Sequence, residues 1–154
     1  MAYEFKVVRR VEFSETDMAG IVHYSNFFRY MEAAETQFFR SLGFSLMTRQ
    51  VEPPVGWPRV HAECDYAQPL RFEDEVEIHL LVSQKKNKSL GYAFRFRKLN
   101  ESPPVEVARG ALTAVCVTHQ GGKMRATKIP KVIADRIEVA PVELLQRGAS
   151  SLPG

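Results

Sequence analysis

The sequence predicts an α+β domain in which a curved antiparallel sheet is wrapped around one long helix. One stretch, residues 25–42, has the apolar spacing of an amphipathic helix, and one strand-like segment precedes it. The strand-like segments after it are joined by turns rather than by further long helices, which is typical of antiparallel pairing. Because one helix cannot cover both faces of a sheet, its apolar stripe must pack on one face, and the other face is left for solvent or for association.

Length and composition are those of one folded domain. The 154 residues are 45% hydrophobic, which excludes wholesale disorder. We assign residues 1–137 to the domain and residues 138–154, which end in GASSLPG, to a C-terminal tail that is partly frayed. The 21 basic and 18 acidic residues leave a net charge of +3, too small an excess to indicate a nucleic-acid partner.

Cysteine usage and hydropathy favour a cytoplasmic protein. The two cysteines, Cys64 and Cys116, lie far apart in strand-like segments, so we expect two buried thiols and no disulfide framework. The chain does not open with a secretory signal, and its longest unbroken apolar stretch, Ala114–Val117, is far too short to insert into a membrane. Residues with metal-binding side chains are too sparse for a zinc site, so we expect no metal.

The first strand and the helix follow from spacing and capping signals. Residues 4–13 alternate in part and are rich in Val and Phe, which predicts a strand. The helix extends from Ser25 to Leu42; either Ser25 or Asn26 is placed to cap its start, and Gly43 to cap its end. Its apolar stripe has spacings of four, three, four and four residues and consists of Phe27, Met31, Ala34, Phe38 and Leu42.

The rest of the chain is predicted to be a connection followed by strands. Residues 44–58 contain three prolines and form a long connection. The segment 120–123 is a hairpin signal, so residues 105–119 and 123–127 are predicted to be its two strands. A short helical segment at 131–137 follows them. The remaining strands are predicted at residues 59–66, 75–82 and 90–99.

An acidic residue precedes the N-terminus of the longest helix. Asp17 stands in a loop that contains Gly20 and leads directly into the helix. The first N–H groups of a helix lack intrahelical partners and carry partial positive charge, so they can hold a carbonyl oxygen as it becomes an oxyanion. The carboxylate of Asp17, seven residues before Tyr24, can then act as a base toward water or attack the carbonyl itself. The alternative is that Asp17 only caps a turn.

Two segments resemble a known enzyme family. Residues 13–32, FSETDMAGIVHYSNFFRYME, resemble the signature of the hotdog-fold acyl-CoA thioesterases of the 4-hydroxybenzoyl-CoA thioesterase type. Residues 65–76, DYAQPLRFEDEV, resemble the Tyr-x-x-Pro-Leu segment of that family and the acidic turn after it. The resemblance covers roughly residues 4–127 and implies a hotdog fold, in which the sheet wraps around the helix.

The resemblance also implies a reaction, the hydrolysis of an acyl-CoA thioester to the free acid and CoA, with coenzyme A as part of the substrate and no cofactor. Asp17 is then the nucleophile or the general base, and the backbone N–H of Tyr24, or one beside it, polarises the thioester carbonyl. Gly20 lets the loop pass close to the substrate, and His23 either positions water or makes only a local hydrogen bond. Many bacterial members have Tyr-His where this chain has His23-Tyr24, and tyrosine at this position resembles the branch that hydrolyses aryl-CoA esters.

A compact basic run is the candidate site for the CoA tail. Lys85, Lys86 and Lys88 lie in a predicted turn. They are either a clamp for the phosphates of coenzyme A, since lysine ammonium groups bind phosphate as point charges, or a solvated turn that discourages edge pairing.

Three further residues are candidates for the acyl pocket. Trp57 stands in the loop before the strand at 59–66, where it either forms a wall of the pocket or only packs. His61 and Glu63 fall on the polar face of that strand, which is either part of a site or an interface. His61-Ala62-Glu63 also matches half of a zinc deaminase signature, but the cysteine-rich half is missing.

The resemblance implies a homodimer, or a dimer of dimers, with sites at the subunit boundary. Two other functions stay open. One is a hotdog hydroxyacyl dehydratase, against which the Asp17 motif argues. The other is a non-catalytic acyl-CoA binding or sensing module, which would bind CoA esters and leave them intact.

Overall fold

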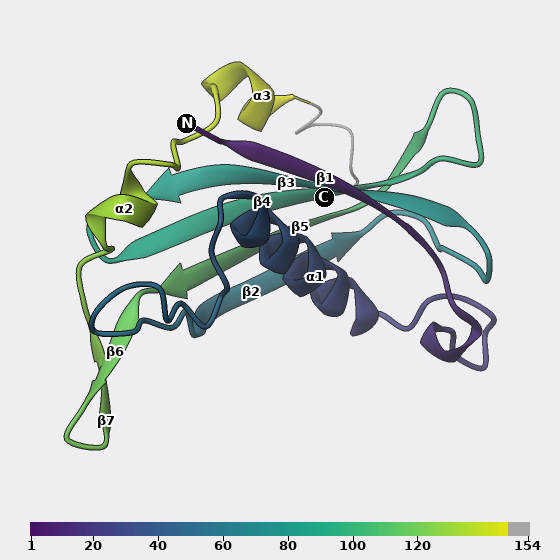
Figure 1. The fold of residues 1–154 in the computed structure, drawn as a ribbon. Helices are drawn as coiled ribbons and strands as arrows, with labels where there is room; N and C mark the ends of the chain where they lie inside the picture. Colours follow the sequence, from purple (N-terminus) through teal and green to yellow (C-terminus); the bar gives the residue numbers. More distant parts are fainter. Residues whose placement is uncertain (148–154) are drawn as a thin grey trace.

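The computed structural model of the chain places five antiparallel strands in one sheet, in the order β1-β3-β4-β5-β2. The structure describes residues 1–147, and residues 148–154 lie outside this description. One long helix, α1 (Asn26–Ser41), lies across one face of the sheet (Figure 1), which confirms the predicted α+β class. The strands of this sheet are β1 (Glu4–Arg10), β2 (Arg59–Tyr66), β3 (Glu75–Lys85), β4 (Ser89–Lys98) and β5 (Val105–Val115).

The buried face of α1 is the apolar stripe that the sequence predicts. Phe27, Met31, Ala34 and Phe38 are all at most 3% exposed and pack into one core with the sheet. Helix and sheet pack tightly at Gly110 of β5, where a Cβ atom would lie 2.1 Å from the Cε atom of Met31. A residue without a side chain at this position therefore lets Met31 fill the space between the two layers.

Both ends of α1 lie one residue inside the predicted bounds. Ser25 precedes the helix, but its hydroxyl contacts the Nδ1 atom of His23 at 2.7 Å and does not cap a helical N–H. At the other end, Gly43 has a φ angle of 93° and its N–H donates to the carbonyl of Arg40 at 3.0 Å. This left-handed ending is the one that glycine favours.

The strand predicted at residues 105–119 is broken in the structure, which corrects that prediction. β5 ends at Val115, and β6 (Val117–Gln120) pairs with β7 (Lys123–Ala126) in a separate two-stranded hairpin. The break falls at Cys116, whose N–H donates to the carbonyl of Lys88 at 2.8 Å. Val117 then exchanges two backbone hydrogen bonds with Gly56, so the long connection before β2 redirects the chain.

Two short helices follow the strands, α2 (Lys131–Ala134) and α3 (Val142–Gln146). α3 lies in the segment that we expected to be partly frayed. The described part of this segment is held against the sheet, because the N–H of Ala140 donates to the carbonyl of Val82 at 2.8 Å and the side chain of Arg95 donates to the carbonyl of Leu144 at 2.6 Å. The final GASSLPG lies outside the described residues.

Both cysteines are free thiols. Cys116 is buried as expected, whereas Cys64 on the edge strand β2 is only partly buried. Burial raises the pKa of each thiol to about 11, so neither is a nucleophile at neutral pH. Among residues 1–147, no helix is long and apolar enough to cross a bilayer.

Candidate active site

The Asp17 carboxylate is held by one oxygen and leaves the other available. Its Oδ1 atom accepts the N–H of Ala19 at 2.9 Å and that of Ile21 at 3.4 Å. The Oδ2 atom accepts no hydrogen bond from any of residues 1–147. Gly20 closes the turn with a φ angle of 80°, and its N–H donates to the carbonyl of Asp17 at 2.9 Å. A glycine at this position relieves the strain of a left-handed backbone.

Glu15 anchors this loop to the start of α1, a role that the sequence does not reveal. Its Oε1 atom accepts the hydroxyl of Tyr30 at 2.8 Å, and its main-chain carbonyl accepts the N–H of His23 at 2.9 Å and the side-chain amide of Asn26 at 2.8 Å. Burial and the bond to Glu15 raise the pKa of Tyr30, so its hydroxyl stays a donor. The loop is therefore pre-positioned rather than free to drift.

The turn that leads into α1 presents an unpaired backbone donor. The N–H of Tyr24 donates no hydrogen bond within residues 1–147, which is the property that the sequence predicts for an oxyanion donor. The carbonyl of the same residue accepts the hydroxyl of Tyr66 at 2.9 Å, so Tyr66 holds the turn in place. Burial and the neighbouring Cys64 raise the pKa of Tyr66, which keeps this donor protonated.

Two neighbouring side chains have local contacts. The Nδ1 atom of His23 accepts the N–H of Ser25 at 3.3 Å and contacts its hydroxyl, which is the local alternative foreseen for this residue. The ring of Tyr24 is 65% exposed and stacks on that of His23, with ring centroids 4.4 Å apart. Neither contact involves Asp17.

A cavity of about 400 Å³ opens beside Asp17. Tyr66 also lines it, and its ring meets that of Phe27 edge to face at 5.0 Å. A cavity of this size, apolar apart from one carboxylate and a few polar groups, suits a small organic substrate whose reactive atom lies near the carboxylate. The residues that line it are Asp17, Ile21, Val22, Tyr24, Phe27, Tyr66, Ala67, Gln68, Pro69 and Leu70.

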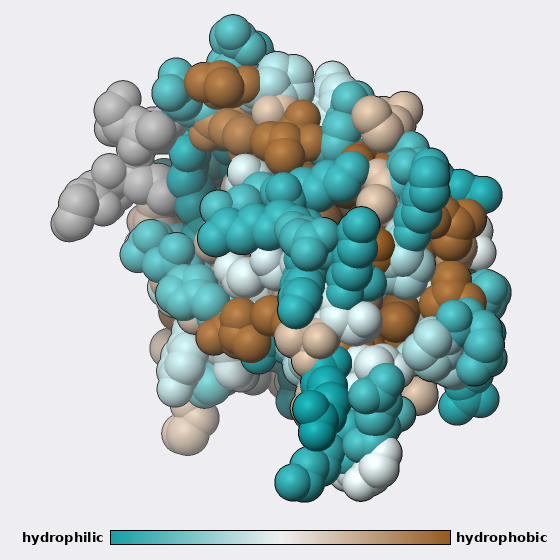
Figure 2. Space-filling view, turned by 90° about the vertical axis from the view of Figure 1, so that its left-hand side faces the viewer, coloured by the Kyte–Doolittle hydropathy of each residue, from teal (hydrophilic) through white to brown (hydrophobic). Residues whose placement is uncertain are grey.

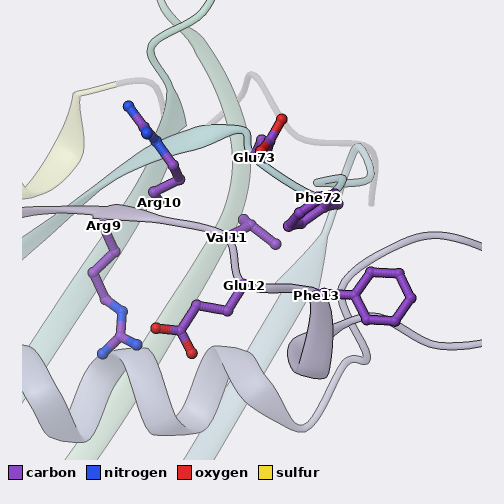
Figure 3. Close-up of a pocket in the computed structure, with 7 residues that line it drawn as sticks. All are labelled: Arg9, Arg10, Val11, Glu12, Phe13, Phe72 and Glu73. Carbon is purple, nitrogen blue, oxygen red and sulfur yellow. The ribbon is translucent and has the colours of Figure 1, made fainter.

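A larger cavity, of about 620 Å³, is lined by residues of β1, of the segment after it and of the turn before β3 (Figure 3). Phe13 and Phe72 form one edge of it, in a T-shaped contact with ring centroids 5.5 Å apart. In Figure 3, Arg9 and Glu12 extend toward α1, whereas Phe13 points away from it. Because Asp17 does not line this cavity, the smaller one is the better candidate for chemistry.

The structure does not bring Trp57, His61 or Glu63 to the Asp17 cavity. Trp57 is 4% exposed and packs edge to face against Phe39, near the C-terminal end of α1. His61 and Glu63 lie 3.6 Å apart on the exposed strand β2. Trp57 is kept away by the direction of β2. The last residue of this strand, Tyr66, lines the cavity, whereas Trp57 lies before its first residue, Arg59. The eight residues of β2, at about 3.3 Å each, therefore separate Trp57 from the cavity.

The three lysines lie far from Asp17 in the same chain. Lys85 is tied to α2 and the segment after it, because its Nζ atom donates to the carbonyls of Ala134 at 2.6 Å and Ile137 at 2.8 Å. The Arg136 side chain donates to the carbonyl of Leu42, which places this turn at the C-terminal end of α1. Asp17 precedes the other end, so the 16 residues of α1, about 24 Å, lie between them. Figure 2 faces this lysine end, where hydrophilic side chains gather.

Fold and cavity together define a hotdog-fold thioesterase. The chain matches the thioesterase-like superfamily over residues 11–137. It therefore belongs to this superfamily, which confirms the resemblance and the enzyme class predicted from the sequence.

Several known proteins are similar to this chain. A candidate esterase from Aquifex aeolicus (strain VF5) is 34% identical over 127 residues, which are 82% of this chain and 92% of the relative. The 4-hydroxybenzoyl-CoA thioesterase of Pseudomonas sp. (strain CBS-3) is 26% identical over 142 residues, 90% of this chain and 99% of the relative. Its solved structure covers 86% of this chain and 99% of its own at 25% identity, with a TM-score of 0.77. A match to a 1,4-dihydroxy-2-naphthoyl-CoA hydrolase of Prochlorococcus marinus (strain MIT 9211), 27% identical, is shorter, at 58% of this chain and 64% of that relative.

Proposed function

We propose that this protein hydrolyses an aryl acyl-CoA thioester to the free acid and CoA. The observation that carries the proposal is the pairing, at one cavity, of a carboxylate with a free Oδ2 atom and a backbone N–H without a partner. The thioester carbonyl accepts the N–H of Tyr24, which stabilises the oxyanion as the carbonyl carbon becomes tetrahedral. Asp17 either attacks that carbon or takes a proton from the water that attacks it, and CoA leaves as the thiolate.

On the nucleophilic route, Asp17 and the acyl group form an anhydride when the thiolate leaves. Water then attacks the anhydride and releases the acid, which restores the carboxylate. On the base route, water attacks the thioester directly. Both routes use only Asp17, the backbone donor and water, so the proposed reaction needs no metal and no separate cofactor.

The aryl preference rests on the cavity wall and on the relatives. Phe27 and Tyr66 present aromatic surface at the cavity, with Pro69 and Leu70 beside them. Aromatic rings prefer edge-to-face or offset contacts with such walls. Similar proteins act on ring-bearing esters by name: 4-hydroxybenzoyl-CoA, 1,4-dihydroxy-2-naphthoyl-CoA and gentisyl-CoA.

A substrate panel tests this function. We expect CoA thiol release, followed with a thiol reagent, to be fastest with benzoyl-type esters and at least about fivefold slower in kcat/KM with short straight-chain esters, because the latter lose ring contacts of about 1 kcal/mol or more. A preference for straight chains would contradict the aryl assignment. Binding without thiol release would indicate a sensing module, and water loss from a hydroxyacyl ester with the thioester intact would indicate a dehydratase.

We also propose a homodimer formed through the edge strand β2. Within residues 1–147 this strand pairs with β5 alone, and seven of its eight residues are exposed. The exposed side chains include Val60 at 64% and Tyr66 at 43%. A long edge with exposed apolar side chains is a template for pairing with another chain, and two-fold pairing of β2 with its copy would continue the sheet.

Such pairing brings opposite ends of the two subunits together. Arg59 of β2 pairs with Ala114 of β5, which pairs with Leu90 of β4, so the lysine turn lies at the Arg59 end of the sheet. Tyr66, at the other end of β2, lines the Asp17 cavity. Antiparallel pairing of two β2 strands places the Arg59 end of one beside the Tyr66 end of the other. The lysine turn of one subunit then lies toward the thioester site of its partner, where CoA phosphates need cations.

Neutralising the two free lysines tests this arrangement. We expect Lys86→Gln combined with Lys88→Gln to raise KM for acyl-CoA about three- to tenfold with little change in kcat, because phosphate contacts hold substrate and transition state equally. Lys85 is left in place since its ammonium group holds two carbonyls near α2. Lys131→Gln, an exposed lysine at the same end, is the matched control. An unchanged KM in the double variant would indicate that Lys86 and Lys88 do not bind CoA and form only a solvated turn.

Mixed dimers show whether the lysines act across the subunit boundary. A dimer of one Asp17→Asn subunit and one Lys86→Gln/Lys88→Gln subunit contains one site with a wild-type aspartate and the wild-type lysines of its partner. Such a site should have the low KM of the wild type. A high KM in the mixed dimer would contradict the arrangement.

A cytoplasmic location is proposed from the cysteines. Cys64 and Cys116 are both unpaired, and free thiols of this kind are typical of a reducing compartment.

A further inference from the structure

A row of basic residues crosses the face of the sheet opposite α1. Lys6 of β1 is paired with His79 of β3, His79 with Arg95 of β4, and Arg95 with Arg109 of β5. Arg95 and Arg109, two permanent cations, are directly opposite each other, and like charges in such positions destabilise a sheet. Stability of the sheet alone therefore does not account for this row.

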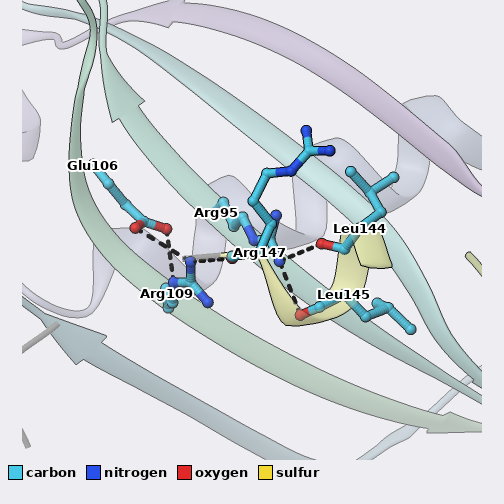
Figure 4. Close-up of polar contacts among 6 residues, drawn as sticks. All are labelled: Arg95, Glu106, Arg109, Leu144, Leu145 and Arg147. Carbon is cyan, nitrogen blue, oxygen red and sulfur yellow. Dashed lines mark hydrogen bonds and ion pairs between the residues drawn. The ribbon is translucent and has the colours of Figure 1, made fainter. Parts of the chain in front are cut away.

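The row faces away from the core. Phe94 and Phe96, on either side of Arg95 in β4, are buried in the core with α1, and alternate residues of a strand point to opposite faces. Figure 4 shows Arg95 and Arg109 reaching toward α3, which lies over this face. Arg95 is nevertheless only 8% exposed and His79 only 6%, because α3 and the neighbouring side chains surround them.

The charges on this face are not balanced within the described chain. Arg97 pairs with Glu77, Arg109 is held by both oxygens of Glu106, and the Nε2 atom of His79 lies 3.5 Å from Glu4. Lys6 and Arg147 form no ion pair with any of residues 1–147. This face thus carries five Lys and Arg side chains but only three carboxylates that pair with its basic residues, those of Glu4, Glu77 and Glu106. The five are Lys6, Arg95, Arg97, Arg109 and Arg147.

Arg95 has donors to spare. Its Nη2 atom donates to the carbonyls of Leu144 and Leu145, at 2.6 and 2.9 Å, which are neutral acceptors. Its Nε and Nη1 atoms donate to no acceptor among residues 1–147. His79 is buried with an Nε2 atom that lacks a hydrogen bond among the described residues, and burial followed by the charge of Lys6 lowers its pKa. The His79 nitrogen is thus a buried polar atom without a partner, and the two Arg95 nitrogens can donate to an added acceptor.

These groups line a cavity of about 470 Å³, together with Tyr3, Pro104 and Leu144. We propose that this cavity binds a small organic anion with two phosphate groups, at a site separate from the thioester cavity. The volume suits a small molecule. Neighbouring strands are about 4.8 Å apart, so the row extends over about 14 Å, longer than one phosphate needs and suited to two. Arginine forks and lysine point charges are the side chains that hold phosphate.

Calorimetric titration with inorganic pyrophosphate tests the site. The wild-type chain should bind about one pyrophosphate, and Arg95→Gln should weaken binding about tenfold or more, because it removes a charge-assisted donor. Since Arg95 also holds α3, Lys6→Gln serves as a second variant: this exposed residue has no ion pair to lose, and we expect binding about threefold weaker. Thioester hydrolysis should be unchanged in Lys6→Gln, since the outer face does not contact Asp17.

An exposed lysine elsewhere supplies the control: Lys131→Gln should leave pyrophosphate binding as in the wild type. Loss of binding in Lys86→Gln combined with Lys88→Gln, with Arg95→Gln and Lys6→Gln unaffected, would place the pyrophosphate on the lysine turn and overturn the proposal. Absence of binding to the wild type at millimolar pyrophosphate would also overturn it. Either result is independent of whether the chain hydrolyses thioesters.

Discussion

Asp17→Asn is expected to lower thioester hydrolysis at least about a hundredfold while leaving the fold intact. The amide of asparagine still offers an oxygen to the N–H groups of Ala19 and Ile21, so the loop keeps its shape. It cannot take a proton from water, however, and it is a poor nucleophile at the thioester carbon. The Tyr24 N–H remains, so substrate binding should survive. Thiol release and circular dichroism, measured on the same preparation, separate these two effects.

A matched carboxylate controls for the change of charge. Asp135→Asn removes an exposed carboxylate that pairs with Lys131, at the opposite end of α1 from Asp17. This variant should hydrolyse thioesters at the wild-type rate. Full activity in Asp17→Asn would show that Asp17 takes no part in the reaction.

The second large effect concerns stability and centres on Glu35. This residue of α1 is fully buried between the helix and the sheet, and its Oε1 atom is paired with Arg59. Its Oε2 atom and the hydroxyl of Tyr92 have no hydrogen-bond partner among the described residues. Burial raises the pKa of Glu35 from 4.5 to about 7, although Arg59 opposes the shift. The protonated form is thus favoured by the fold.

The sign of the pH dependence follows from this shift. Between about pH 4.5 and pH 7 the folded chain retains a proton that the unfolded chain releases, so the free energy of unfolding falls as pH rises through this range. A shift of this size corresponds to roughly 3 kcal/mol. We expect Glu35→Gln, which cannot ionise, to remove this decline and to be more stable than the wild type at pH 8.

Urea unfolding at pH 5 and pH 8 measures the effect. The two proteins should differ more at pH 8 than at pH 5, and Glu32→Gln, on the exposed side of the same helix, should follow the wild type at both. An equal pH dependence in Glu35→Gln and the wild type would mean that the buried carboxylate does not titrate in this range. Hydrolysis need not change in Glu35→Gln, since Glu35 does not line the Asp17 cavity.

Residues that are close along the chain were predicted well because local physics determines them. The helix bounds were correct to one residue, since the apolar stripe and Gly43 mark them. Asp17 and Tyr24 are separated by one short loop, so their shared place at the helix start follows from spacing alone. In the sequence, Tyr66 stands out only as part of a motif, although in the structure it lines the cavity and holds the turn at Tyr24.

Residues that are distant along the chain are placed by geometry that composition does not reveal. The lengths of β2 and α1 carry Trp57 and the lysine run to the opposite end of the same domain from Asp17. Nothing in a strand's composition says which of its ends meets the helix N-terminus. The basic row on the outer face was equally invisible, because Lys6, His79, Arg95 and Arg109 become neighbours only through strand register.

The sequence by itself determined the long amphipathic helix, the antiparallel strands, and an acidic loop before the helix N-terminus. Each of these depends on spacing within a few turns or on a short motif, which local backbone preferences and apolar periodicity suffice to specify. Tertiary structure alone decided which end of each strand lies near Asp17, that β2 is an unpaired edge, and that four basic residues meet on one face. These properties depend on strand order and register, which arise only when the apolar faces of helix and sheet pack together. The opening prediction of one free sheet face thus became specific: that face is basic and partly covered by α3.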